Sequence, residues 1–296
     1  MTRPTGTSPV WITIALLASI LSVLTGCREH PGSNPPGELA ASRVVSLSPA
    51  LSQILIDLGQ ADTIVGCTPW APEELADVPV VGDLLEPDLE RITVVRPNLI
   101  VVQPTQLGID PGLRDLAERH DCRIVGWELN RLADVDRVLA ELPDVLASVG
   151  VAAESINDRI ATWRARRDDM LVPDPDVRSM GSTVLLFGVD PPMAFGRETY
   201  VDDLWSSLGG LNAIEGDGYL DCSLEDLLVL EPANIVVLAS TSDAADLQAR
   251  RLRAALGERA EAIVFLPVDG GDLLVPGTRI LDGVATLRSQ LDGGAS

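Results

Sequence analysis

A short helix followed by a buried strand is written twice in this chain. Leu89–Val102 reads LERITVVRPNLIVV, and Leu224–Val237, 135 positions later, reads LEDLLVLEPANIVV. Seven of the fourteen aligned positions are identical: the Leu-Glu start, one Val, the Pro and the closing Ile-Val-Val. In each copy the proline stops the helix, and the apolar run after it is typical of a buried parallel strand. The repeat predicts two lobes of the same design.

A second pair of segments supports the two lobes. LSQILIDLGQADTIVG (51–66) and VDDLWSSLGGLNAIEG (201–216) share a Leu-Gly at the helix end, then an Ile and a Gly. Their offset is 150 positions, because the loop that follows is longer in the first half, 67–88 against 217–223. Short β-branched runs alternate with helical patterns throughout, which is typical of parallel α/β architecture.

The segment 151–171 differs from the rest because its helical pattern is long. Ile156, Ile160 and Trp163 form an apolar stripe opposite a charged face, and Pro173 ends the pattern. A helix of about 20 residues reaches about 30 Å, which is enough to cross a small domain. We expect strands over 43–48, 63–68, 99–103, 123–128, 183–188, 234–240 and 262–268, and helices over 50–58, 89–95, 112–120, 134–148, 201–208, 224–230, 244–256 and 279–291.

The N-terminal 27 residues read as an export signal. The apolar run Trp11–Leu24 has fourteen residues, which is too short to span a bilayer, and it ends in LTGC. That ending resembles the lipobox of bacterial lipoproteins, which implies lipidation of Cys27. An ordinary signal peptide or a short anchor is the alternative. We therefore expect a signal peptide (1–27), a Pro/Gly/Ser-rich tether (28–41), an N-terminal lobe (42–150), a linking helix (151–172) and a C-terminal lobe (173–296).

Composition excludes several function classes. The formal net charge is −22, with 44 acidic and 22 basic residues, and argues against nucleic acid as a partner. Cys67, Cys122 and Cys222 have no metal-like spacing, so we interpret them as small buried hydrophobic residues. A disulfide, which an exported protein can form, is the alternative. The two histidines are His30, in the tether, and His120, at a helix end. A direct zinc or manganese site, a protein cofactor and His-dependent catalysis are therefore not expected, and the sequence has no nucleophile-elbow, phosphate-loop or HExxH motif.

The repeated glutamates, Glu90 and Glu225, have two interpretations. Each falls in the first turn of a helix capped by Asp88 or Ser223, where the helix dipole stabilises a carboxylate by about 0.3–1 kcal/mol. That local role is sufficient for either one alone. The recurrence of the glutamate in both lobes instead suggests two acidic contacts with a two-fold symmetric partner that carries basic sockets.

The chain resembles the substrate-binding proteins of cobalamin and iron-siderophore ABC importers. The resemblance rests on the lipobox, SRVVSLSPALSQILIDLGQADTIVG, PDLERITVVRPNLIVV, the long central helix and SLEDLLVLEPANIVV, and covers roughly 42–290. It implies two Rossmann-like lobes with parallel sheets joined by one rigid backbone helix, which allows modest lobe movement. It also implies a ligand held between the lobes and salt bridges from Glu90 and Glu225 to arginines of a dimeric permease.

The resemblance also implies which residues line the cleft. Trp70 and Tyr219 fall where cobalamin binders place aromatic side chains, but Leu84 and Gln103 stand where two more are expected. Only 3% of the chain is aromatic, so a cleft walled entirely by aromatic rings is excluded. The loop DPPMAFGRETY offers Arg197 for a ligand carboxylate or phosphate, although a surface role is as consistent with its position. The expected cleft residues are Ser48, Pro49, Trp70, Gln103, Met193, Phe195, Arg197 and Tyr219.

These observations predict a monomeric, lipid-anchored binding protein of the cell envelope or periplasm. It would deliver a corrinoid or a ferric siderophore to an ABC permease dimer. The alternatives are a sensor or scaffold domain with the same two lobes and, less favoured, an α/β enzyme. Trp127 and Trp205 are expected in the core.

Overall fold

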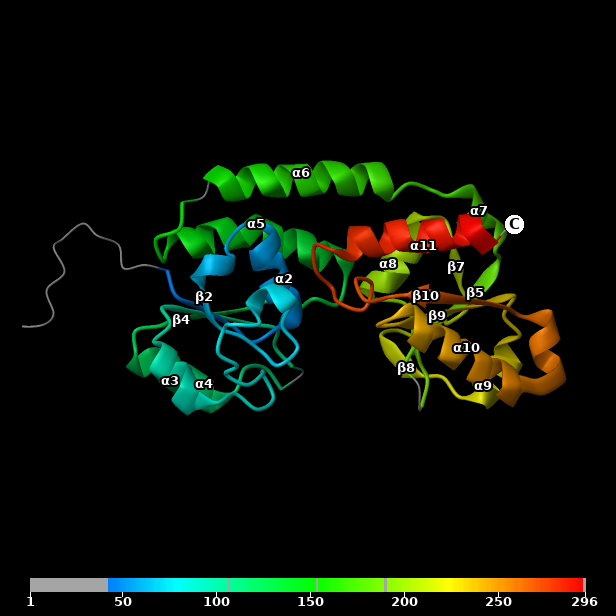
Figure 1. Ribbon diagram of the computed structural model, residues 1–296, viewed down its shortest axis with the longest axis horizontal. Helices are drawn as coiled ribbons and strands as arrows, with labels where there is room; N and C mark the ends of the chain where they lie inside the picture. Colours follow the sequence, from blue (N-terminus) through cyan, green and yellow to red (C-terminus); the bar gives the residue numbers. More distant parts are fainter. Residues whose placement is uncertain (1–41, 106, 153, 189–190, 295–296) are drawn as a thin grey trace, which may run out of the picture. The chain divides into compact units, whose positions relative to one another are not determined.

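The N-terminal lobe is built on a four-stranded parallel sheet in the order β2-β1-β3-β4 (Figure 1). The computed structural model describes residues 42–105, 107–152, 154–188 and 191–294, which form one compact unit. The central strands β1 and β3 are buried along their whole length, as expected for a parallel sheet covered on both faces. The strands are β1 (Val44–Ser46), β2 (Ile64–Gly66), β3 (Leu99–Val102) and β4 (Arg123–Gly126).

The helices of this lobe start at clear sequence signals. Ser48 caps the first helix by accepting the Leu51 N–H at 3.3 Å, and Pro49 is its first residue. Asp110 and Pro111 start a later helix in the same way. The helices are α2 (Pro49–Asp57), α3 (Leu89–Val95), α4 (Pro111–Arg119) and α5 (Leu132–Ala147), with short 3₁₀ turns η1 (Ala61–Thr63) and η2 (Glu73–Leu75).

The C-terminal lobe has a mixed sheet in the order β10-β9-β5-β6-β8. Strands β10, β9 and β5 are parallel, whereas β6 pairs antiparallel with both β5 and β8, and β7 pairs parallel with β5. The sequence pattern did not predict β6 and β8, because each has three residues and no β-branched run. The strands are β5 (Ser182–Phe187), β6 (Met193–Phe195), β7 (Leu211–Asn212), β8 (Tyr219–Asp221), β9 (Asn234–Ala239) and β10 (Val264–Asp269).

The linking helix α6 (Glu154–Met170) packs against both lobes. Its stripe of Ile156, Ile160 and Trp163 is buried, as the sequence predicted, and it contacts α5 and α11 (Figure 1). The Trp163 Nε1–H donates to the Thr278 carbonyl oxygen at 2.8 Å. Buried apolar residues of both lobes form one continuous hydrophobic cluster. The remaining helices are α7 (Pro175–Ser179), α8 (Tyr200–Ser207), α9 (Leu224–Leu230), α10 (Ser242–Leu256), η3 (Gly257–Ala262) and α11 (Ile280–Gly294).

The repeat is visible in the backbone as well as in the sequence. Helices α3 and α9 both end in a left-handed residue that is not glycine: Arg96 has φ 45° and Glu231 has φ 43°. Such a residue costs roughly 1–2 kcal/mol. In both copies a buried proline follows and the chain enters the sheet. The same unfavourable turn at the same place in each lobe confirms that the two helix–strand units share one design.

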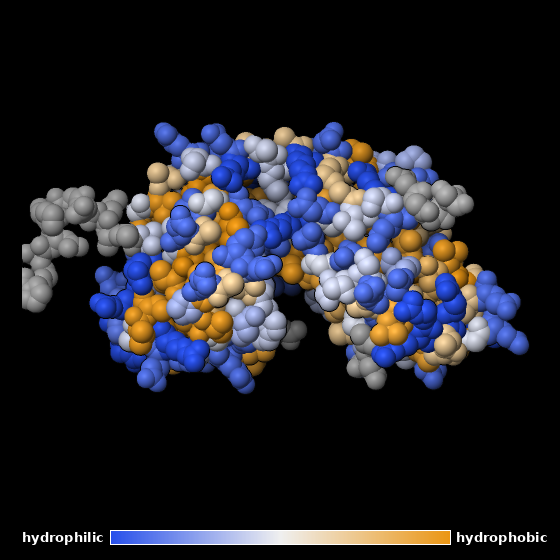
Figure 2. Space-filling view, viewed as in Figure 1, coloured by the Kyte–Doolittle hydropathy of each residue, from blue (hydrophilic) through white to orange (hydrophobic). Residues whose placement is uncertain are grey.

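Hydrophilic side chains cover much of the face shown in Figure 2, and hydrophobic ones gather on the N-terminal lobe. Within the described residues, no helix is long and apolar enough to cross a membrane. The expected signal peptide, Cys27, His30 and the tether lie outside the described residues.

Candidate ligand cleft and docking surfaces

Two of the expected cleft residues meet at the carboxyl edge of the first sheet. Ser48 follows β1 and Gln103 follows β3, so the parallel strands deliver both to the same edge. The Ser48 hydroxyl donates to Gln103 Oε1 at 3.2 Å. Ser48 is buried and Gln103 is half-buried, so Gln103 is the one with polar surface at this edge. This is the edge at which open α/β sheets bind ligands.

Pro49 and Trp70 line one pocket of about 550 Å³ together with residues from the C-terminal lobe. The Trp70 side chain is 66% exposed, although a tryptophan of a folded domain is usually well covered. The opposite wall comes from the loop between β10 and α11, which contributes Val275 and Arg279. The pocket therefore spans both lobes and presents a wide aromatic face. Its other lining residues are Gln53, Pro72, Glu73 and Glu74.

The one arginine of this pocket is already paired. Arg279 Nη2 lies 3.0 Å from Asp57 Oδ1 and 2.7 Å from Glu74 Oε1. The pKa of Glu74 is lowered by its own backbone N–H and then by the Arg279 guanidinium. With Glu73 also at the rim, the pocket is net negative. It therefore favours neutral or cationic parts of a ligand over a free carboxylate.

In the C-terminal lobe, the expected residues Met193, Phe195 and Tyr219 lie on the two antiparallel strands β6 and β8. Phe195 pairs with Tyr219 across the strands, with ring centroids 5.6 Å apart, and both rings also contact Phe187. Phe195 is 1% exposed, whereas Tyr219 is 42% exposed. Phe195 therefore packs beneath Tyr219 in the interior, and Tyr219 is the ring that can face a ligand. Burial raises the pKa of Tyr219 above its ordinary value.

Arg197 lies on the loop after β6 and is exposed. Its guanidinium is 3.7 Å from Asp217, and the backbones of the two residues also form a bridge. Both side chains are more than half exposed, so the ion pair is weak. Arg197 is therefore free enough to meet an anionic group, and its carbonyl oxygen accepts the Gly218 N–H at 2.6 Å, beside Tyr219.

Glu90 and Glu225 occupy equivalent, exposed positions in the first turns of α3 and α9. Figure 1 draws both helices on the side of their lobes away from α6. The neighbouring polar side chains are used locally, because Asp88 caps α3 and pairs with Arg91, and Ser223 and Asp226 form the capping box of α9. Neither repeated glutamate has an ion pair or hydrogen bond from its side chain to any part of the chain described in the structure.

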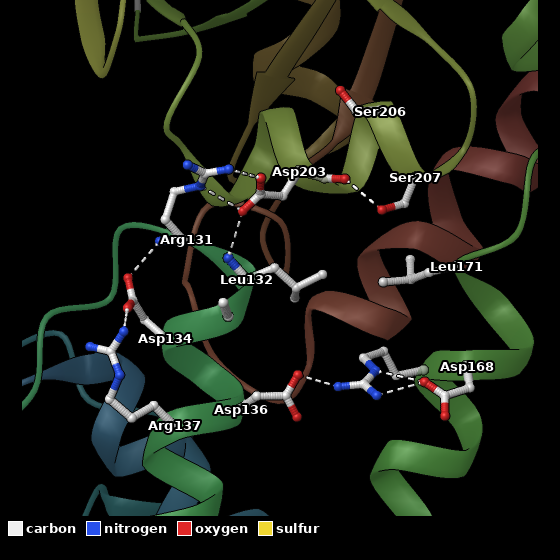
Figure 3. A pocket seen from close by; sticks show the side chains of 12 residues that line it. Arg131, Leu132, Asp134, Asp136, Arg137, Asp168, Leu171, Asp203, Ser206 and Ser207 are labelled. Carbon is white, nitrogen blue, oxygen red and sulfur yellow. Dashed lines mark hydrogen bonds and ion pairs between the residues drawn. The ribbon is translucent and has the colours of Figure 1, made fainter.

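A cavity of about 920 Å³ lies where α5, α6 and α8 meet and was not expected from the sequence (Figure 3). It is lined by three arginines and four aspartates, which form ion pairs with one another. Arg131 binds Asp203 through two nitrogens, Arg137 pairs with Asp134, and Arg167 with Asp136 and Asp168. The Asp203 pair raises the pKa of Arg131. The pairs of Arg131 with Asp203 and of Arg167 with Asp136 join the start of α5 to α8 and α5 to α6, whereas the other two pairs lie within one helix. Every arginine that lines this cavity is therefore already paired.

The three cysteines that the structure describes lie in the interior. Cys67, Cys122 and Cys222 are unpaired and buried, which confirms their interpretation as hydrophobic residues. Burial raises the pKa of all three thiols. Among the described residues no three His, Cys, Asp or Glu side chains gather as a metal site. Trp127 and Trp205 are in the core, as expected.

Sequence reasoning missed the residues that join the lobes. Arg131, Asp203, Asp57 and Arg279 are far apart in the chain, and nothing in their local pattern marks them as partners. One signal was present for the pocket wall, since Val275 and Arg279 follow the carboxyl end of a predicted strand. No signal separated Phe195 from Tyr219, because the burial of each depends on the unpredicted pairing of β6 and β8.

Comparison with known proteins identifies folds that are similar to this one. No curated protein matches the sequence significantly. The fold is similar to the periplasmic vitamin B12 binding protein BtuF of Vibrio cholerae, with 19% identity, 86% of this chain and 98% of that chain covered and a TM-score of 0.66. It is also similar to the periplasmic heme-binding protein RhuT of Roseiflexus sp. RS-1, with 20% identity, 87% of this chain and 100% of that chain covered and a TM-score of 0.68. A periplasmic heme binding protein of Pseudomonas aeruginosa is similar as well, with 23% identity, 84% of this chain and 92% of that chain covered and a TM-score of 0.65. The family model described as "Periplasmic binding protein" matches residues 44–256, and the chain therefore belongs to the periplasmic binding protein family.

Proposed function

We propose that this chain is an extracytoplasmic lipoprotein that captures a bulky metal chelate between its two lobes and delivers it to the permease dimer of an ABC importer. Membership of a family of binding proteins supports capture rather than catalysis. The observation that carries the proposal is the pair of exposed glutamates, one per lobe, at equivalent positions of a repeated helix. A sensor or scaffold would need the ligand cleft but would not need this pair.

The ligand class follows from the surfaces available to it. Trp70 and Tyr219 offer aromatic faces, one from each lobe, and Gln103 offers an amide at the edge of the first sheet. Because the described residues hold no cluster of metal ligands, a metal would enter inside an organic chelate. A corrinoid and a ferric siderophore are bulky chelates of this kind. Heme is a third chelate of this kind and is bound by two of the similar proteins.

Fluorescence titration of the mature chain tests the ligand. Trp70 is 66% exposed, whereas Trp127, Trp163 and Trp205 are each 9% exposed or less, so Trp70 should dominate any quenching by a ligand. We expect cobalamin, cobinamide, a ferric siderophore or heme to quench with a Kd of micromolar or below. Trp70→Phe should reduce the signal while calorimetry still detects binding. If none of the four binds at micromolar concentration, capture of a bulky chelate is wrong.

Docking is tested separately, with the permease and ATPase complex of the importer reconstituted in lipid nanodiscs. Glu90→Ala with Glu225→Ala should abolish binding to that complex and leave ligand affinity unchanged, because each carboxylate would meet a permease arginine. Glu118→Ala with Glu258→Ala is the matched control, since it removes one exposed glutamate from each lobe elsewhere on the surface. Loss of ligand affinity in the first variant would instead place the glutamates in the cleft.

The anchor belongs to the same proposal. Lipidation of Cys27 would hold the protein at the membrane surface, and the tether at 28–41 would let the lobes reach the permease. Mass spectrometry of the mature N-terminus should find a diacylglyceryl-modified Cys27. If the mature protein instead began at another residue and carried no lipid, the anchor would be wrong and the protein would diffuse freely.

A further inference from the structure

Five of the seven identical positions in the repeated helix–strand unit are explained by packing. The two prolines are buried, and the Ile-Val-Val of each strand is at most 1% exposed. The leading leucines, Leu89 and Leu224, are partly buried and pack against the hydrophobic cluster of their own lobe. Each of these residues is required by the interior of its lobe, so their recurrence follows from the shared fold.

Two identical positions remain, and both are exposed. One is the glutamate, Glu90 or Glu225. The other is the single valine of each helix: Val94 is 72% exposed and Val229 is 83% exposed. The two positions are four residues apart, so in each lobe the glutamate and the valine lie on the same face of the helix, one turn apart. The unit thus repeats an acidic group beside an apolar one on its surface.

Local physics does not favour a valine at these positions. A β-branched residue is a poorer helix former than the polar residues that usually occupy an exposed turn. The surrounding surface is not copied either, since Arg91 corresponds to Asp226 and Arg96 to Glu231. The charges near the glutamate have therefore diverged between the lobes, while the exposed glutamate and valine are the same in both.

We propose that Val94 and Val229 form the apolar part of the contact with the permease dimer, each resting in a small apolar depression beside the arginine that receives the adjacent glutamate. The inference rests on the proposed docking function and names a second group in it. An ion pair supplies charge complementarity but buries little apolar surface. A valine one turn away that becomes buried on docking supplies the apolar contact that the glutamate does not make.

Charge favours the permease over a second copy of this chain as the occupant of this face. With a net charge of −22, two copies meeting through faces that each carry an unpaired glutamate would bring like charges together. A partner with two equivalent basic sockets matches the glutamates, and its two-fold symmetry matches the presence of one glutamate–valine pair in each lobe.

The test compares Val94→Ser with Val229→Ser against Val172→Ser with Val264→Ser, which changes two exposed valines outside α3 and α9. Binding to the nanodisc-reconstituted permease complex is measured over a range of salt concentrations. The first variant should bind about tenfold to a hundredfold more weakly at every salt concentration, with an unchanged salt slope, because only apolar contact is lost. The control should bind as the unsubstituted protein does.

The outcomes separate this inference from the docking proposal. If Glu90→Ala with Glu225→Ala abolishes binding while the valine variant binds normally, the valine inference is wrong and the docking proposal stands. If the glutamate variant binds normally, both fail. If the valine variant changes sedimentation of the isolated protein rather than permease affinity, the occupant is a second copy and the inference is wrong. Unchanged urea denaturation of the valine variant confirms that the fold is intact.

Discussion

Replacing Asp203 by alanine should loosen the contact between the two lobes. Asp203, on α8 of the C-terminal lobe, is 20% exposed and accepts three hydrogen bonds from the N-terminal lobe (Figure 3). Arg131 donates Nε–H at 2.9 Å and Nη2–H at 2.5 Å, and the Leu132 backbone N–H donates at 2.9 Å. Leu132 is the first residue of α5, so an aspartate of one lobe caps a helix of the other.

The size of the effect follows from these contacts. A hydrogen bond to a charged group contributes about 1.5–3 kcal/mol, and the lower end applies because Arg131 is 35% exposed and keeps its ion pair with Glu198. Loss of the acceptor for the Leu132 N–H adds about 0.5–1 kcal/mol. The free energy of unfolding should therefore fall by about 2–2.5 kcal/mol. For a chain of this size that lowers Tm by about 4–10 °C.

Glu198→Ala is the matched control, because Glu198 pairs with the same guanidinium at 2.6 Å but is 65% exposed. It should change the free energy of unfolding by at most about 1 kcal/mol. Urea denaturation measures both variants, and hydrogen exchange should show faster exchange of the Leu132 amide in Asp203→Ala alone. Equal effects of the two substitutions would refute the argument from burial.

Two further predictions concern buried groups of single elements. Gln248→Met on α10 should raise the free energy of unfolding by about 1–3 kcal/mol, seen as a higher urea midpoint with an unchanged m-value. Gln248 is 2% exposed, and neither its amide oxygen nor its amide nitrogen has a hydrogen-bond partner among the described residues. The thiols of Cys122 and Cys222 should react with an alkylating reagent at pH 8 at least about a hundredfold more slowly in the folded than in the urea-unfolded protein. Burial, and then a nearby aspartate, raises the pKa of each thiol to about 11, so the thiolate is scarce until the pH approaches that value. If the thiols reacted as fast in the folded as in the unfolded protein, they would be accessible and this reasoning would be wrong.

The sequence predicts this fold well wherever one local pattern decides the structure. Helices α3 and α9 begin and end at the residues expected, because an N-cap, an apolar turn and a proline define each boundary. The parallel strands were found because a strand buried on both faces must be a short apolar run. Strands β6 and β8 were missed because each is a strand only through its pairing with the other, and the composition of neither segment indicates a strand.

The candidate cleft is predicted less completely, for a related reason. Ser48 and Gln103 could be expected to meet, since both follow strands of one parallel sheet. Trp70 shares a pocket with Arg279, 209 positions away, only because a loop of the other lobe reaches it. Whether a side chain such as Phe195 faces the cleft or the core depends on residues that are distant in the sequence, such as Tyr219, and the local sequence pattern does not identify them.

The contacts between the lobes bear on how a permease could recognise a loaded protein. Arg131 with Asp203, and Arg279 with Asp57, tie the lobes together, and Trp163 of α6 bonds to the loop that carries Arg279. The lobes also share one hydrophobic cluster, and a large rotation would expose part of it to water. Lobe movement on ligand binding should therefore be small, so that α3 and α9 remain placed for a fixed two-fold partner whether or not the cleft is filled. Under the proposed docking, a permease would then discriminate between the loaded and the empty protein through small shifts of the two glutamate–valine pairs or through direct contact with the ligand at the mouth of the cleft.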